Sequence, residues 1–139
     1  MARTAWNTLA RPVGTIFAAL AVAGATSCSD SPTTPSPPAV ATIEVGAESF
    51  RVLLTTEAQV RGAEAARDGG PASIPVGRIV AGTGANTGWT WHLEELTFAE
   101  AAIELCDGLP SHVEKAGPTF GNGQYCPWSA RVTMIESQE

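Results

Sequence analysis

Apolar and polar residues alternate along two neighbouring stretches of the chain, residues 42–45 and residues 50–54. Alternation with a period of two is typical of a strand that buries one face. Residues 46–49 separate the two stretches and supply a glycine for the turn. The pattern therefore predicts a β-hairpin, with these inward side chains: Ile43, Val45, Phe50, Val52 and Leu54.

The pattern changes at Thr56, where a helix is expected to begin. Thr56 and Gln59 have the spacing of a capping box, and residues 69–71 (Gly-Gly-Pro) stop the segment, so the helix should span residues 57–67. Gly62 in its interior costs about 0.5–1 kcal/mol relative to alanine. Its apolar stripe is thin, consisting of Val60, Ala63 and either Ala66 or Ala58. We therefore expect this helix to cover a sheet.

Residues 74–80 predict the next strand, with Pro75 at its beginning, where a missing N–H is tolerated. A glycine-rich segment, residues 82–88, follows. A phosphate-binding loop would continue into Lys-Ser or Lys-Thr and then a helix, whereas this segment continues into a strand pattern. We interpret it as a mobile turn.

Residues 89–93 predict a strand that carries Trp89 and Trp91 on one face and His92 on the other, and Glu94 with Glu95 should make a turn. A further strand is expected from Leu96 to Cys106, with a β-bulge at residues 99–101. Its inward side chains should be Leu96, Phe98, Ala101, Ile103 and Leu105. A helix over residues 98–106 is the alternative, because Ala-Glu-Ala-Ala favours helix; the alternation at 103–105 favours the strand.

Pro110 starts a second short helix, in which Ser111 and Glu114 have capping-box spacing, and residues 117–118 (Gly-Pro) end it. Residues 128–134 alternate as a last strand. Together the elements predict an α+β fold, a mostly antiparallel β-sheet with two short helices and one disulfide.

The first 27 residues have the pattern of an export signal, with two arginines before a ten-residue apolar stretch that is too short to span a bilayer. Small residues run directly into Cys28, as in a bacterial lipobox, so Cys28 is the expected lipidation site. The alternative is cleavage after residues 23–25, which leaves Cys28 as a free thiol. Residues 28–40 are rich in Ser, Thr and Pro and predict an extended tether, followed by a single α+β domain at residues 41–139.

The number of cysteines supports this arrangement. The chain has three, and an exported protein that pairs its cysteines in disulfides would leave one of them over. If Cys28 carries lipid, Cys106 and Cys126 remain to form a disulfide in an oxidising compartment. The expected location is the cell envelope, with the protein anchored to a membrane by lipid. Ser29 favours the outer membrane in a cell that has one.

Charge narrows the range of partners. All 14 acidic residues follow Cys28, whereas two of the eight basic residues precede it, so the mature protein is strongly acidic. Nucleic acid requires Lys and Arg on its binding protein, and anionic lipid attracts basic segments. Both are therefore poor partners for the domain, and cations or basic surfaces are better ones.

Four blocks of sequence occur in this order in a small family: residues 74–80, residues 89–93, residues 98–107 and residues 125–129. Over residues 41–136 the chain resembles members of this family, which are similar to the N-terminal domain of a slime-mould protein, and many bacterial members carry the label calmodulin-binding protein. The resemblance implies a domain without an assigned activity. Calmodulin targets are basic amphipathic helices, and the helix predicted at residues 57–67 balances Arg61 and Arg67 with two glutamates, so calmodulin is an unlikely partner.

Candidate chemistry is sparse. His92 with Glu94, Glu95, Glu100 or Glu104 could hold a metal or act in acid–base chemistry, but the sequence lacks metal-binding spacings and a nucleophile elbow. We therefore predict no catalytic residue, metal or cofactor. His112 is expected in a cap, and Arg78 in a surface ion pair with Glu104 or Asp107.

The aromatic residues are the better binding candidates, because an exposed aromatic ring can serve as a platform for a sugar, a peptide or a protein. The possible ligand-binding residues are Trp89, Trp91, His92, Tyr125 and Trp128. The leading hypothesis is a non-enzymatic binding or interaction module with an unknown envelope ligand. The alternatives are a small hydrolase or metal-dependent enzyme that uses His92, and an inhibitor of secreted proteases.

Overall fold

The computed structural model describes residues 34–138, which form two three-stranded antiparallel sheets and two α-helices. The predicted signal peptide and Cys28 lie outside the described residues. The elements in order are β1 (Ala39–Val45), β2 (Glu48–Leu54), α1 (Glu57–Arg67), β3 (Ile74–Ala81), β4 (Trp91–Ala99), the 3₁₀ helix η1 (Glu104–Cys106), α2 (Pro110–Ala116), the 3₁₀ helix η2 (Gly117–Gly123), β5 (Gln124–Tyr125) and β6 (Arg131–Ser137). The α+β class is confirmed, but the strands form two sheets and not one.

The first sheet has the order β2-β1-β6 and contains the predicted hairpin. All five side chains predicted to point inward from the hairpin are buried. Strand β1 begins at Ala39, two residues before the predicted domain boundary, because Ala39 pairs with Leu54 on one side and Ser137 on the other. Strand β6 begins at Arg131, three residues later than predicted, since Trp128 and Ser129 precede it in a turn.

The second sheet has the order β4-β3-β5. Strand β4 runs without interruption through Glu94 and Glu95, so the predicted turn is wrong. The register between β3 and β4 shifts at this place, and Glu95 adopts a left-handed backbone conformation with φ of 54°. One extra residue in one strand is a β-bulge. Gly77 faces it, and a Cβ there would lie 3.0 Å from Leu93 Cβ, so a side chain at this position would crowd the facing strand.

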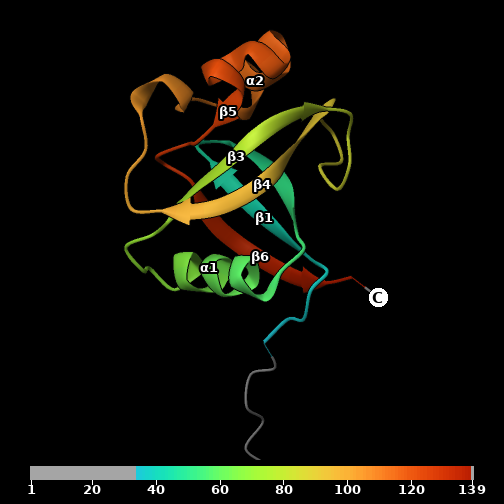
Figure 1. Ribbon diagram of the computed structural model, residues 1–139, viewed down its shortest axis with the longest axis vertical. Coiled ribbons are helices and arrows are strands. Elements are labelled where there is room, and N and C mark those ends of the chain that lie inside the picture. The colour runs from blue at the N-terminus through green and yellow to red at the C-terminus, as the bar shows by residue number, and fades with distance from the viewer. Residues whose placement is uncertain (1–33, 139) are drawn as a thin grey trace, which may run out of the picture. The chain divides into compact units, whose positions relative to one another are not determined.

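The core lies between the inner faces of the two sheets, with α1 beside β6 and α2 at the opposite end of the domain (Figure 1). Its centre is aromatic: Phe50 from β2 lies 5.8 Å from Trp91 and 5.3 Å from Tyr125, measured between ring centroids. Trp91 and Tyr125 also contact each other edge to face, an arrangement that aromatic pairs prefer. The aromatic cluster therefore joins one sheet to the other.

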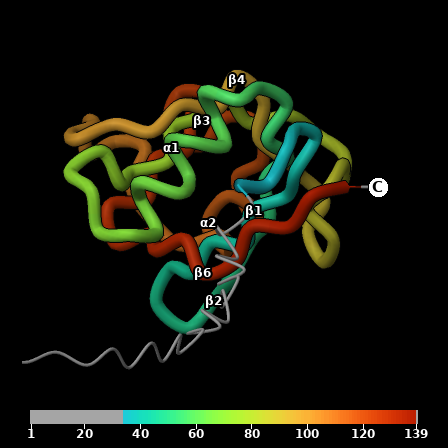
Figure 2. Tube along the Cα trace, turned by 90° about the horizontal axis from the view of Figure 1, so that it is seen from below, coloured from blue at the N-terminus to red at the C-terminus, as the bar shows by residue number. Residues whose placement is uncertain are grey.

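Helix α1 confirms the predicted bounds and capping box, with Thr56 Oγ1 accepting from Gln59 N at 3.2 Å. Val60, Ala63 and Ala66 are buried, whereas Ala58 is exposed. The helix packs against β6 and β4 (Figure 2). Gly62 is a packing requirement of this contact, because a Cβ there would lie 2.8 Å from Phe98 Cδ2.

Two side-chain amides fasten the edge of β2 to the edge of β4. Asn86, which is fully buried, accepts from Arg51 N at 2.8 Å and donates to Trp91 O at 2.9 Å. Gln59 accepts from Thr55 N at 2.7 Å and donates to Leu96 O at 3.0 Å. We call Asn86 and Gln59 the two amide clasps.

Beyond Ala99 the chain forms neither the predicted strand nor the alternative α-helix. It runs without regular structure to η1, and the predicted Cys106–Cys126 disulfide is confirmed there, with 5.1 Å between the Cα atoms. Ala101, Ile103 and Leu105 were expected to point inward, and all three are exposed. The physical reason is that β3 begins at Ile74, which pairs with Ala99, so no strand lies opposite the residues that follow.

Helix α2 has a cap that comes from another part of the chain. Ser111 N donates to Glu48 Oε2 at 2.8 Å, and Leu109 N donates to His112 Nδ1 at 3.3 Å. The cap role of His112 is confirmed. The predicted capping box is wrong, because the Glu114 carboxylate instead accepts from Thr90 N and Thr90 Oγ1.

This cap predicts a dependence of stability on pH. Hydrogen bonds from the Ser111 side chain and main chain hold the pKa of Glu48 below its usual value of 4.5. A carboxylate with a lowered pKa in the folded state stabilises the fold above its unfolded pKa, and this stabilisation is lost as the pH falls through the folded pKa. We expect Glu48→Gln to weaken the loss of stability below pH 4.5, measured by urea unfolding across the acid range. Glu104→Gln is the control, because the Glu104 side chain is exposed and has no hydrogen bond or ion pair with the other residues in the range 34–138. Its unfolding should respond to acid as that of wild type does.

Candidate functional site

A groove of about 350 Å³ runs between the exposed edges of the two sheets. Its walls come from β2 and β4, α1 closes one end, and the glycine-rich loop closes the other. We call it the edge groove; the lining residues used below are Arg51, Leu53, His92, Leu93, Glu94 and Glu95. Its volume lies at the lower end of the range of small-ligand sites.

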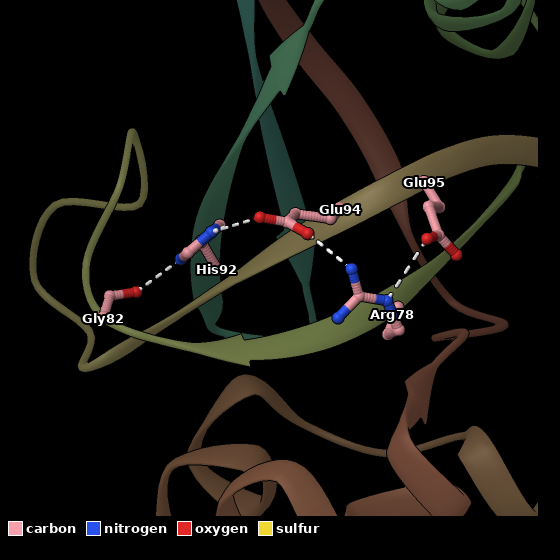
Figure 3. Close-up of polar contacts among 5 residues, drawn as sticks. All are labelled: Arg78, Gly82, His92, Glu94 and Glu95. Atoms are coloured by element: carbon pink, nitrogen blue, oxygen red, sulfur yellow. Dashed lines mark hydrogen bonds and ion pairs between the residues drawn. The ribbon is translucent and has the colours of Figure 1, made fainter.

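His92 lies in a line of polar contacts along β3 and β4 (Figure 3). His92 Nδ1 is 2.6 Å from Gly82 O, which fixes the proton on Nδ1 and leaves Nε2 3.5 Å from Glu94 Oε1. Glu94 Oε2 in turn accepts a hydrogen bond from Arg78, whose Nε is 3.4 Å from Glu95 Oε1. The predicted surface ion pair of Arg78 is therefore real, but its partners are Glu94 and Glu95 and not Glu104 or Asp107.

This arrangement orients His92 but gives it only one close carboxylate. The Glu94 carboxylate also forms an ion pair with Arg78, and Arg78 forms a second ion pair with Glu95. Glu100 and Glu104 lie beyond the end of β4, on the segment that precedes the disulfide. Among residues 34–138, no three His, Cys, Asp or Glu side chains lie close enough to hold a metal ion. The chemistry that the groove displays is polar recognition by fixed hydrogen-bonding groups.

The aromatic candidates separate into core and surface. Trp91 and Tyr125 are buried, and burial raises the pKa of Tyr125, whose hydroxyl donates to Gly108 O at 2.9 Å. Trp89 is half-buried against the core and donates from Nε1 to Ser49 O. Trp128 differs from all of these, with 47% of its surface exposed. Of the four, only Trp128 is available as a platform.

Trp128 belongs to a group of exposed apolar side chains beside the disulfide. Ile103 is 59% exposed and Leu105 is 58% exposed. With Trp128 they make up what we call the stapled patch. The Ile103 carbonyl lies 3.3 Å from both cysteine sulfurs, and Trp128 N donates to Asp107 Oδ1 at 2.8 Å. The disulfide and this hydrogen bond hold the two segments of the patch together.

A hollow of about 220 Å³ adjoins the Trp128 side chain. Ile74 and Ala102, which pack against the disulfide, line it together with Ala101 and Glu100. A half-exposed indole beside an apolar hollow is the kind of site that accepts one anchoring side chain of a partner.

The model of the family described as the BP-74 N-terminal domain matches residues 37–139. The chain belongs to this family. The resemblance inferred from the four sequence blocks is thus confirmed, over a range that begins four residues earlier than expected. No curated protein and no solved structure matches the chain.

Sequence reasoning found His92 and Trp128 in this BP-74 N-terminal domain but missed two features of its surface. Ile103 and Leu105 alternate with Glu104 and so gave a strand signal, although they are the most exposed apolar side chains of the patch. Asn86 had only one signal, namely that it is the single amide within a glycine-rich segment. Within the described part of the BP-74 N-terminal domain, no helix is long and apolar enough to cross a membrane.

Proposed function

We propose that the protein is a non-enzymatic interaction module of the cell envelope, and that the stapled patch is its contact surface for a protein partner. The observation that carries the proposal is the joint exposure of Ile103, Leu105 and Trp128 around a disulfide. Exposed apolar side chains that are scattered singly are ordinary, whereas several on two segments that a disulfide holds together indicate an interaction site. The disulfide reduces the entropy lost when such a surface is ordered on binding.

Charge selects the kind of partner. Residues 100–107 carry Glu100, Glu104 and Asp107, and neither this segment nor residues 121–130 contains Lys or Arg. An acidic rim around an apolar centre fits a protein surface on which an apolar anchor is flanked by basic residues. It opposes adsorption to anionic lipid.

The placement at the envelope follows from the leader. The export signal, the lipidation of Cys28 and the Ser/Thr/Pro-rich tether remain proposals drawn from the sequence, as does the expectation that calmodulin is not the partner. A lipid-anchored domain on a tether needs no membrane-binding surface of its own, which leaves the stapled patch available for a protein.

Trp128→Ala tests the proposal. Tryptophan hot spots contribute at least about 2 kcal/mol, so the variant should weaken the complex about 30-fold or more. The measurement is the native mass of the protein extracted from its own cells in mild detergent. The wild-type protein should have the mass of a complex with a partner. The Trp128→Ala variant should have the mass of the protein alone.

Met134→Ala is the matched control, because Met134 is a similarly exposed apolar side chain on β6, outside the patch. It should keep the wild-type mass. If Trp128→Ala and Met134→Ala give the same mass as wild type, or if wild type itself migrates without a partner, the proposal is wrong.

A further inference from the structure

The edge groove lies between two strands that are neighbours in space but not partners in a ladder. Among residues 34–138, β2 pairs only with β1, and β4 only with β3. The two strands nevertheless contact each other. An unpaired strand edge presents a row of main-chain N–H and C=O groups, and such rows bind other extended chains.

Side chains satisfy part of this row on β2 and at Thr55, the residue that follows it. Three bonds do so: Trp89 Nε1 donates to Ser49 O at 2.9 Å, Arg51 N donates to Asn86 Oδ1 at 2.8 Å, and Thr55 N donates to Gln59 Oε1 at 2.7 Å. Main-chain groups on one edge of a strand recur every second residue. The main-chain groups of Leu53 therefore point toward the same edge, where β2 has no partner strand and, among residues 34–138, no hydrogen bond to these groups is found.

The edge of β4 shows the same arrangement. Trp91 O accepts from Asn86 Nδ2, and Leu96 O accepts from Gln59 Nε2. Leu93 lies two residues after Trp91, so its main-chain groups point toward the same edge as the Trp91 carbonyl. Within residues 34–138 these groups of Leu93 also lack a partner on that side.

The two amide clasps thus close the gap between β2 and β4 at both ends and leave it open in the middle. Leu53 and Leu93 both line the edge groove there. We propose that the edge groove binds a short extended peptide segment, whose main chain forms hydrogen bonds with Leu53 on one wall and Leu93 on the other. This is recognition by strand addition, in which main-chain bonds supply affinity and side chains supply selectivity.

The charges on the β4 wall select the side chain of the peptide. Glu94 and Glu95 are 47% and 73% exposed and share a single arginine, Arg78. Arg51 on the β2 wall is itself paired with Glu136, with 3.6 Å between Nη2 and Oε2. Three carboxylates therefore accompany two guanidinium groups in and beside the groove, and the net charge there is negative. The segment that binds should therefore carry Lys or Arg next to the main chain that pairs with Leu93.

Amide hydrogen exchange of the free protein gives the first test. Arg51 N–H is bonded to Asn86 and should exchange slowly, whereas Leu53 and Leu93 N–H should exchange rapidly. If Leu53 and Leu93 are protected as strongly as Arg51 in the free protein, their groups are not available and the proposal fails.

Peptide titration of isotope-labelled protein gives the second test. The probe is a capped Val-Lys-Val tripeptide at millimolar concentration, and amide chemical shifts of the protein should change at Leu53, Leu93 and their neighbours. A Val-Glu-Val peptide should bind about fivefold more weakly, since exposed ion pairs contribute up to about 1 kcal/mol. Methylation of the peptide nitrogens removes its donors and should abolish binding.

Two variants separate this site from the stapled patch. The double variant Glu94→Gln/Glu95→Gln should remove the preference for the lysine peptide, and Trp128→Ala should leave the titration unchanged. No shift at Leu53 and Leu93, or equal binding of the methylated peptide, overturns the proposal. Neither result bears on the proposed function, which concerns the other surface.

Discussion

Reduction of the Cys106–Cys126 disulfide is expected to lower the free energy of unfolding by about 3 kcal/mol, because the bond closes a loop of about 20 residues in the unfolded chain. In a domain of this size, 1 kcal/mol corresponds to roughly 4–8 °C in Tm. The measurement is urea unfolding with and without dithiothreitol. The two cysteines are buried with Ile74 in a small cluster, so loss of the bond also loosens the base of the stapled patch.

The double variant Cys106→Ala/Cys126→Ala provides the control for reduction. It should unfold at the midpoint of the reduced wild type and should not respond to dithiothreitol. If reduction of the wild type changes the free energy of unfolding by less than about 1 kcal/mol, residues 106–126 are already restricted in the unfolded chain without the bond.

Asn86→Ala is expected to lower the free energy of unfolding by about 3 kcal/mol. The substitution removes two hydrogen bonds and leaves Arg51 N–H and Trp91 C=O without partners, and each buried group left unsatisfied costs about 1–3 kcal/mol. It also removes the side-chain bridge between β2 and β4 at one end of the edge groove. Chemical denaturation measures the loss.

Thr87→Ala is the matched control for Asn86→Ala, because Thr87 is the next residue of the same loop and is exposed. Its effect should lie within about 0.5 kcal/mol. If the two variants unfold at the same urea concentration, Asn86 does not join the sheets and the clasp is an incidental contact.

Elements whose signals are local could be predicted from the sequence. The hairpin alternates cleanly over residues 42–54, and α1 carries its own capping box in Thr56 and Gln59. The pairing of Cys106 with Cys126 followed from counting cysteines. In each case the residues that decide the structure lie close together in the sequence or are of a rare type.

Elements that depend on distant partners could not be predicted. The α2 cap uses Glu48, which lies 63 residues before Ser111. The strand expected through Leu105 ends at Ala99, because its neighbour β3 begins at the paired residue Ile74. The bulge at Glu95 lies opposite Gly77 on β3, where a side chain would crowd Leu93. A strand pattern predicts what a segment can form, but the neighbouring strand decides where it ends.

The stapled patch and the edge groove also depend on both local residues and distant partners. His92 and Trp128 are rare residue types and could be recognised as candidates, whereas the exposure of Ile103 and Leu105 depends on the missing neighbour of the segment that carries them. The edge groove exists only because β2 and β4 approach each other without pairing, which no local pattern contains.

The most direct test of the proposed function is site-specific photocrosslinking in living cells. A photoreactive phenylalanine analogue replaces Leu105 in the stapled patch, and in a matched strain it replaces Arg61, an exposed residue of α1. The account predicts one discrete protein adduct from position 105 that disappears when Trp128→Ala is added, and no such adduct from position 61. Equal adducts from both positions, or an adduct from position 105 that survives Trp128→Ala, would contradict the claim that the stapled patch is the contact surface.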